Sequence, residues 1–281
     1  MLHAAHILCL GSSTSAAGTQ AAHLARRTGA TLHVMPRPSG RAGAGPTGSD
    51  PGSGAEAAVP AHVVETHPRS VTAVLQYVGD ADIDLVVADT PLDRGPVPPL
   101  ATDLTRALTR RLDRPVFVVE RQDDPDVVQR LLVPTDLSAP ALRAFRHAVA
   151  LARLYDAAID VLHVIESVPY VALTPTDRLS LGATTLSERR GRRRLRAFLQ
   201  EGEAAGVQVQ SHIMRGAAAD QISRFANQGD VDLMVLSAHG SDAEEGPLGP
   251  VGARVLGRVT RPLFLVRASG PSLLGPPDDA A

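Results

Sequence analysis

The 281-residue chain carries a formal net charge of −2, and 44% of its residues are hydrophobic against 21% that are charged. This balance is typical of a globular protein, and the length is sufficient for two domains with cores of their own. The charge gives no whole-chain reason to expect binding to nucleic acid or to an anionic membrane.

The chain begins with an apolar stretch that we interpret as a strand rather than as a targeting segment. Its first ten residues, MLHAAHILCL, lack a basic flank, and their apolar part is short for a signal peptide. No apolar run of the sequence reaches the roughly 18 to 20 residues that span a bilayer. Cys9 is the only cysteine, which rules out an internal disulfide, fits a reducing compartment and predicts a small core residue. The expected location is therefore the cytoplasm.

The next segments of the first half are a turn, a strand and an insertion. Residues 11–18, GSSTSAAG, are predicted to cap a helix rather than to bind phosphate, because no Lys follows them. A second strand is predicted at 31–35. Residues 36–60 are dense in Gly, Pro, Ser and Ala and cannot bury enough apolar surface to offset their ordering entropy, so we predict a disordered, inert insertion. A recognition segment is the weaker alternative, since the stretch has no aromatic residue or charge cluster.

Similar segments occur in the same order in the two halves of the chain. The matching pairs are DIDLVVADTP (82–91) with DVDLMVLSAH (230–239), and DRPVFVVERQ (113–122) with TRPLFLVRAS (260–269). Two copies, offset by 148 and 147 residues, are too few for a solenoid, so we predict tandem domains at 1–122 and 128–270. The polar stretch QDDPD links them, and residues 271–281 are expected to form a frayed tail.

The second copy alternates apolar runs with helical patterns. The predicted strands are 130–136, 159–166, 207–216, 231–238 and 261–267, and the predicted helices are 137–157, 186–206, 217–229 and 250–260. One buried stripe is predicted along the first of these helices, at steps of three and four residues: Leu142, Phe145, Val149 and Ala152.

Strands that alternate with helices and read as near-continuous apolar runs predict parallel sheets covered on both faces. We therefore predict an α/β fold with two tandem five-stranded parallel sheets of similar topology. The last strands of the two copies, 116–120 and 263–267, would otherwise be open edges, so we expect them to pair with each other. Ligands of such sheets bind beyond the carboxyl ends of the strands, which directs attention to Asp136 and to the end of the strand at 159–166.

Four segments of the second half carry a family resemblance. They are LLVPTDLSAPALRAFRHAVALARLYDAAIDVLHVIE, IMRGAAADQISRFA, DVDLMVLSAHG and PVGARVLGRVTRPLFLVR. Together they resemble a universal stress protein domain over nearly all of 130–267, and the first half resembles the same family more weakly. The resemblance implies a tandem protein of Rossmann-like, adenine nucleotide alpha-hydrolase-like domains that pair through their last strands. The family contains members that bind ATP and members that do not.

The resemblance also implies a set of candidate ligand contacts. In ATP-binding members, the Pro and Asp of a PTD turn lie beside adenosine, which corresponds here to Pro134 and Asp136, and a Val on the second strand corresponds to Val164. The phosphates occupy a loop of the pattern Gly, two residues, Gly, nine residues, Gly, then Ser or Thr. The remaining candidate residues lie in or beside that loop: His239, Gly240, Gly249 and Val251.

The phosphate half of this pattern is altered. Ser237 stands in place of the first Gly, only eight residues separate Gly240 from Gly249, and Pro250 replaces the Ser or Thr. Proline supplies neither a hydroxyl nor a backbone N–H to a phosphate. The loop also contains three acids, Asp242, Glu244 and Glu245, which would repel a triphosphate. We therefore expect ATP to bind weakly or not at all.

The first copy departs further from the pattern. Gly11 occupies the place of Asp136, and the three loop positions hold Leu92, Thr102 and Asp103. Gly11 has no carboxylate to replace that of Asp136, and the loop positions no longer hold glycines. We therefore expect the first domain to be degenerate and structural.

Two further features favour a structural interpretation. The basic run RRGRRRLR (189–196) is bracketed by Glu188, Glu201 and Glu203, which favours a solvated helix face over a nucleic-acid site. His163 and His239 are expected near the sheet edge, but no short-spaced set of His, Cys and Asp accompanies them, so we predict no metal site.

The leading hypothesis is a non-enzymatic stress-response or regulatory protein with a degraded nucleotide site. No catalytic residue is assigned, because the loop has no Lys or Arg and no paired carboxylate and base stand at a fixed spacing. ATP or another adenine nucleotide in the second domain is the one candidate cofactor. The alternatives are an ATP-binding protein with slow or no hydrolysis, and a scaffold for an unknown protein partner. We expect no nucleic-acid or membrane partner, and a homodimer remains open beside the intramolecular pairing.

Overall fold

The computed structural model describes residues 2–35, 61–63, 70–89, 108, 111–119, 128–166, 181–238 and 249–275. The first half contains β1 (His6–Leu10), α1 (Ala16–Thr28), β2 (Thr31–Met35), β3 (Ala61–Val63), α2 (Val71–Asp80), β4 (Leu85–Asp89) and β5 (Val116–Val119). The second half contains β6 (Arg130–Thr135), α4 (Ala139–Tyr155), β7 (Ala158–Ile165), α6 (Leu181–Glu201), β8 (Val209–Arg215), α7 (Ala218–Gln228), β9 (Leu233–Ser237), α8 (Gly249–Leu256) and β10 (Leu263–Val266). The predicted insertion at 36–60 and the predicted linker lie outside the described residues, and the domain limits stay a prediction.

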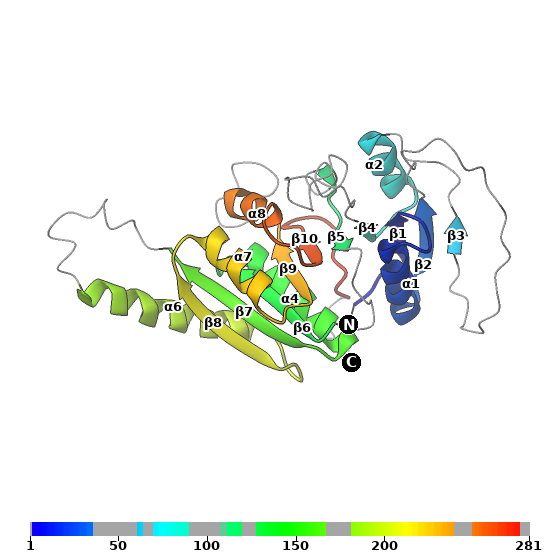
Figure 1. The fold of residues 1–281 in the computed structure, drawn as a ribbon. Helices are drawn as coiled ribbons and strands as arrows, with labels where there is room; N and C mark the ends of the chain where they lie inside the picture. The colour runs from blue at the N-terminus through cyan, green and yellow to red at the C-terminus, as the bar shows by residue number, and fades with distance from the viewer. Residues whose placement is uncertain are drawn as a thin grey trace.

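All of these strands form one sheet in the order β3-β2-β1-β4-β5-β10-β9-β6-β7-β8 (Figure 1). Within each half the strands are parallel. The first three strands of a half lie side by side from the middle of that half to its outer edge, and the last two strands lie on the other side of the first strand. The strand order therefore reverses between β1 and β4 in the first half and between β6 and β9 in the second. The predicted α/β fold of two five-stranded parallel sheets is confirmed.

The two halves meet where β5 and β10 pair in antiparallel orientation. Leu263 lies opposite Val118, and Phe264 lies opposite Phe117. The two phenyl rings pack edge to face with their centroids 5.6 Å apart, and both side chains are buried. The predicted pairing of the last strands is confirmed, and it removes two apolar edges that would otherwise be open.

Each face of the sheet carries one apolar cluster. Helices α1 and α4 cover one face, while α2, α7 and α8 cover the other. The predicted stripe of α4 is buried, because Leu142, Phe145, Val149 and Ala152 all face the first cluster. Ser138 begins α4 by accepting a hydrogen bond from the backbone N–H of Ala141 at 3.3 Å.

Residues 271–275 differ from the frayed tail that we expected. Leu273 is buried, and its carbonyl accepts a hydrogen bond from the backbone N–H of His3 at 2.7 Å. Arg143 of α4 donates to the carbonyls of Gly270 and Pro271, at 2.6 and 2.9 Å. This segment therefore joins the start of the chain to α4 of the second half.

Candidate functional site

A cavity of about 330 Å³ opens at the carboxyl ends of β6, β7 and β9, where the strand order of the second half reverses. Such a reversal is the usual ligand crevice of an open α/β sheet. The described residues that line it come from the ends of these strands and from the first turns of α4, α7 and α8: Pro134, Thr135, Asp136, Ala141, Leu162, His163, Val164, Glu166, Ala218, Ile222, Leu236, Ser237, Gly249, Pro250, Val251 and Gly252. The volume is at the lower end of the range for small-molecule sites.

Five of the residues selected from the sequence line this one cavity: Pro134, Asp136, Val164, Gly249 and Val251. The other two, His239 and Gly240, lie outside the described residues. The structure thus brings together segments that are more than 110 residues apart in the chain. Their role as ligand contacts stays a prediction.

A tight turn holds Asp136 at the mouth of the cavity. One carboxylate oxygen of Asp136 accepts hydrogen bonds from the backbone N–H and the hydroxyl of Ser138, at 3.0 and 2.5 Å. The hydroxyl of Thr135 accepts from the backbone N–H of Leu137 at 2.9 Å. Leu137 has a left-handed φ of 65°, so the turn is sharp. These bonds fix the direction of the Asp136 carboxylate before any ligand arrives.

His163 of β7 lies between the cavity and the turn. Its Nδ1 is 2.9 Å from the carbonyl oxygen of Thr135. Because a carbonyl can only accept, Nδ1 carries a proton and donates it to this bond. His163 therefore braces the end of β6 against β7.

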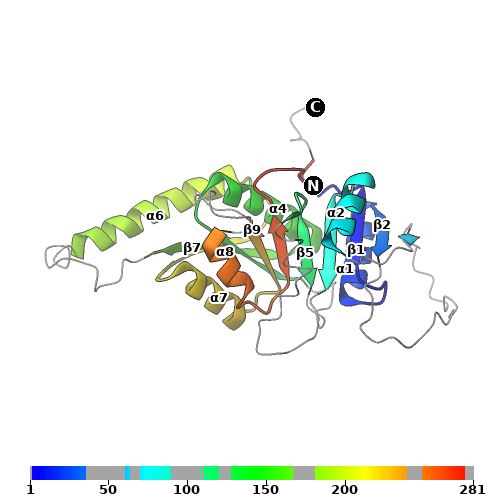
Figure 2. The ribbon, with the colours of Figure 1, turned by 90° about the horizontal axis from the view of Figure 1, so that it is seen from above.

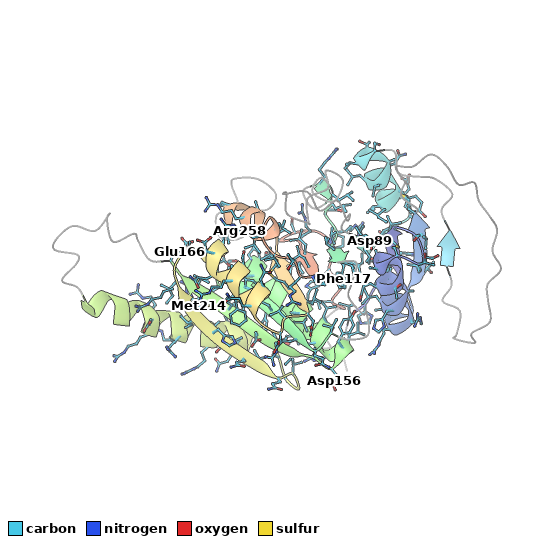
Figure 3. The ribbon with its side chains drawn as sticks, viewed as in Figure 1. Asp89, Phe117, Asp156, Glu166, Met214 and Arg258 are labelled. Carbon is cyan, nitrogen blue, oxygen red and sulfur yellow. The ribbon has the colours of Figure 1, made fainter. Side chains whose placement is uncertain are left out.

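The lining also includes a second carboxylate that the sequence analysis did not select. Glu166 follows β7 directly and is exposed at the cavity mouth, and Figure 3 shows it at the end of that strand. The rule that ligands bind at the carboxyl ends of strands indicated this segment, but no motif distinguished the residue itself. Asp136 and Glu166 make the mouth acidic, and no Arg or Lys occurs among the described lining residues.

Among the described residues, the end of the cavity where α8 begins lacks one backbone donor. Helix α8 begins here at Gly249, whose φ of 54° suits glycine, and Pro250 follows in the first turn. Proline has no N–H, so one of the free amides of the helix N-terminus is missing where a phosphate would need it. The loop with Asp242, Glu244 and Glu245 lies outside the described residues.

At the corresponding strand ends of the first half, where β1 and β4 lie side by side, there is a carboxylate of the protein itself. Asp89, at the end of β4, accepts a hydrogen bond from the backbone N–H of Ala17 in the first turn of α1, at 2.5 Å. A Cβ at Gly11 would lie 2.8 Å from the other carboxylate oxygen of Asp89 and 2.7 Å from the hydroxyl of Ser15, which caps α1. Glycine at position 11 therefore leaves the room that Asp89 occupies. Burial, and to a smaller extent the charge of Asp89, raises the pKa of Cys9 to about 12, so this thiol stays protonated.

Two other observations concern the described residues as a whole, and a third concerns the start of α1. They contain no group of three or more His, Cys, Asp and Glu side chains that could hold a metal ion. None of the helices that the structure describes is long and apolar enough to cross a membrane. Ser15 caps α1 by accepting from the N–H of Gly18 at 3.2 Å, as predicted for the segment at 11–18.

Comparisons with known proteins agree with this architecture. Residues 128–267 match the model of the universal stress protein family. Universal stress protein MJ0531 of Methanocaldococcus jannaschii is 28% identical over 143 residues, which cover 50% of this chain and 84% of that protein. Among solved structures, a functionally unknown protein, PA1789, from Pseudomonas aeruginosa PAO1 matches with a TM-score of 0.71 at 16% identity. The match covers 94% of this chain and 92% of PA1789. A universal stress protein from Archaeoglobus fulgidus DSM 4304 matches with a TM-score of 0.60 at 13% identity. This match covers 94% of this chain and 98% of the Archaeoglobus chain. The two solved structures share the fold over both halves, and the family match covers the second half: residues 128–267 form a domain of the universal stress protein family.

Proposed function

We propose that this protein is a non-enzymatic, cytoplasmic regulator of the stress-response type, in which the second half binds a small ligand and the first half is structural. The ligand is adenosine or a molecule of similar size and polarity, and ATP binds only weakly.

The polarity of the cavity carries this proposal. Its walls are mostly apolar, its mouth has the carboxylates of Asp136 and Glu166, and its described lining has no positively charged Arg or Lys. A neutral or positively charged ligand can enter without electrostatic cost, whereas each phosphate brings negative charge toward two carboxylates. Pro250 removes one of the backbone amides that could compensate.

The contact of Asp89 with the first turn of α1 supports a single site per chain. Asp89 already supplies a negative group to the N-terminus of α1, where a ligand anion would have to compete with it. We infer that the first half acts through its pairing with the second and through its contribution to the sheet.

Calorimetric titration with adenosine, AMP and ATP, each with and without magnesium, tests the proposal. We expect one site per chain, with adenosine bound more tightly than ATP and ATP no tighter than roughly millimolar, about −4 kcal/mol. Asp136→Asn should weaken adenosine binding, because the fixed carboxylate is lost, whereas the same change at the exposed Asp156 at the end of α4 should not. Tight ATP binding in magnesium, with Asp136 and Glu166 serving as cation ligands, would instead favour the ATP-binding alternative.

A further inference from the structure

Strand β8 is the outermost strand of the second half. It pairs with β7 from residue 209 to residue 215, and no other described segment pairs with its outer edge. Gln210, Ser211 and Arg215 are exposed along it. An open edge presents a row of backbone N–H and C=O groups that only another polypeptide strand can satisfy in full.

Helix α6 runs alongside this edge. Its buried positions, Gly191, Leu195 and Phe198, face the sheet, and a Cβ at Gly191 would lie 3.2 Å from Ile165 of β7. Glu188 forms an ion pair of 2.8 Å with Arg215 at the end of β8. The flank of α6 that carries Glu188 therefore faces the outer strand. Figure 2 shows the helix extending away from the rest of the chain on this side.

The same flank continues with positive charge. Arg192 and Arg196 follow Glu188 at intervals of four residues, which places them in one row along the helix surface. Both side chains are exposed. This row runs beside β8, starting from the ion pair at Arg215.

The exposed side of α6 carries a dense run of arginines. Six arginines are exposed between residues 189 and 196, and no ion pair of theirs occurs within the part of the chain that the structure describes: Arg189, Arg190, Arg192, Arg193, Arg194 and Arg196. Several of them are three or four positions apart, a spacing at which like charges destabilise a helix. A partner with negative charge would relieve this repulsion.

The spacing of the arginine row matches the spacing of a strand. Four residues of an α-helix rise about 6 Å, and two residues of a β-strand rise about 6.6 Å. Side chains at alternate positions of a strand point to the same face. Acidic residues at every second position of an added strand would therefore lie at the level of Arg192 and then of Arg196.

We propose that β8 and the Arg192–Arg196 flank of α6, together called the β8 edge surface, bind an extended polypeptide segment with acidic residues at alternate positions. The segment adds a strand to the sheet beside β8, its acidic side chains face α6, and the residues between them face the side of Met214 and Phe225. This surface is separate from the cavity and does not depend on the proposed ligand. Figure 3 shows Met214 on β8.

Other occupants fit these observations less well. A nucleic acid could meet the arginines but could not use the backbone edge, and the exposed part of α6 offers no aromatic side chain for stacking. A second copy could pair through its own β8 in antiparallel orientation. That pairing would place two arginine-rich α6 helices side by side on the same face of the sheet, where they would repel each other.

Fluorescence anisotropy on the full chain tests the proposal with a labelled eight-residue peptide of alternating Val and Glu. We expect binding that weakens as salt is added, and a loss of about tenfold in the double variant Arg192→Glu, Arg196→Glu. The matched control is Arg190→Glu with Arg194→Glu, which makes the same change in charge on the opposite flank and should lose less than about threefold. Methylation of alternate backbone nitrogens of the peptide should abolish binding, because the added strand loses its donors. All four positions are exposed, so circular dichroism should show both double variants folded.

Four outcomes would overturn the proposal. They are the absence of peptide binding, an equal loss in the two double variants, tighter binding of a 20-base-pair DNA duplex than of the peptide, and a homodimer of the unmodified protein that the Arg192 and Arg196 changes strengthen. Adenosine titration of the same variants keeps the two proposals apart, since changes in the β8 edge surface should leave cavity binding unchanged.

Discussion

Lowering the pH should weaken the fold through His147, a residue of α4 with no exposed surface. The Nδ1 of His147 donates to the carbonyl of Arg143 at 2.8 Å, and its Nε2 accepts from the backbone N–H of Leu273 at 3.3 Å. The second contact requires the neutral ring, because a protonated Nε2 could no longer accept. Burial, partly offset by the bond to the Arg143 carbonyl and reinforced by the Arg143 charge, lowers the pKa of His147 from 6.5 to about 4.

The sign and size of the effect follow from this shift. The unfolded chain binds a proton at His147 near pH 6.5 and the folded chain only near pH 4, so falling pH favours unfolding across this window. Above pH 6.5 the contribution is complete, and below pH 4 it is fully lost. At about 1.36 kcal/mol per pKa unit the whole loss is about 3 kcal/mol, of which roughly 2 kcal/mol has gone by about pH 5.

Urea unfolding at about pH 7.5 and pH 5 measures this contribution. His147→Gln should be less stable at pH 7.5, because the side chain is imperfectly replaced, but its stability should fall by about 2 kcal/mol less on acidification than that of the unmodified protein. His3→Gln, at an exposed position, serves as the matched control and should keep the original pH dependence. An unchanged pH dependence in His147→Gln would refute the reasoning.

Three other predictions concern the loop beside the cavity, the strand ends of the first half and the junction between β5 and β10. Changing Pro250 to Ser together with neutral residues at the three acids of the loop should raise ATP affinity more than adenosine affinity in calorimetry, and an equal gain for both ligands would show that the loop is not the defect. Asp89→Ala should cost about 1 kcal/mol in urea unfolding, because the amide of Ala17 loses its acceptor, and no loss would mean that water replaces the carboxylate freely. Phe264→Ala should cost about 3–5 kcal/mol, because it leaves a cavity against Phe117 in the buried junction, and a change below about 1 kcal/mol would contradict the packing described here.

The fold could be predicted from the sequence because its signals are local or repeated. The stripe of α4 is a periodic pattern, and the offset of 148 residues aligned β4 with β9 before any strand order was known. The pairing of β5 with β10 followed from the absence of any other cover for two apolar last strands. Helix α6 begins at Leu181, five residues before the predicted start.

The contacts that escaped prediction join residues that are distant in sequence and carry no pattern. Asp89 and Ala17 are 72 residues apart, and nothing in either segment indicates that a carboxylate fills the place beside Gly11. Leu273 lies in a short Gly- and Pro-rich stretch, and its partners are His3 and His147. Glu166 is the last residue of the predicted strand at 159–166, but only the cavity itself shows that the side chain lines the site.

The antiparallel junction between β5 and β10 makes the carboxyl strand ends of the two halves point away from each other. Because the strands of the two halves run in opposite directions, the carboxyl ends of β6 and β9 lie on one side of the sheet and those of β1 and β4 lie on the other. A small ligand in the cavity of the second half therefore cannot also contact the corresponding strand ends of the first half. Any influence of that ligand on the first half has to pass through the contacts between the halves, which include the Phe117–Phe264 pair and the hydrogen bond from Gln20 of α1 to Tyr155 of α4.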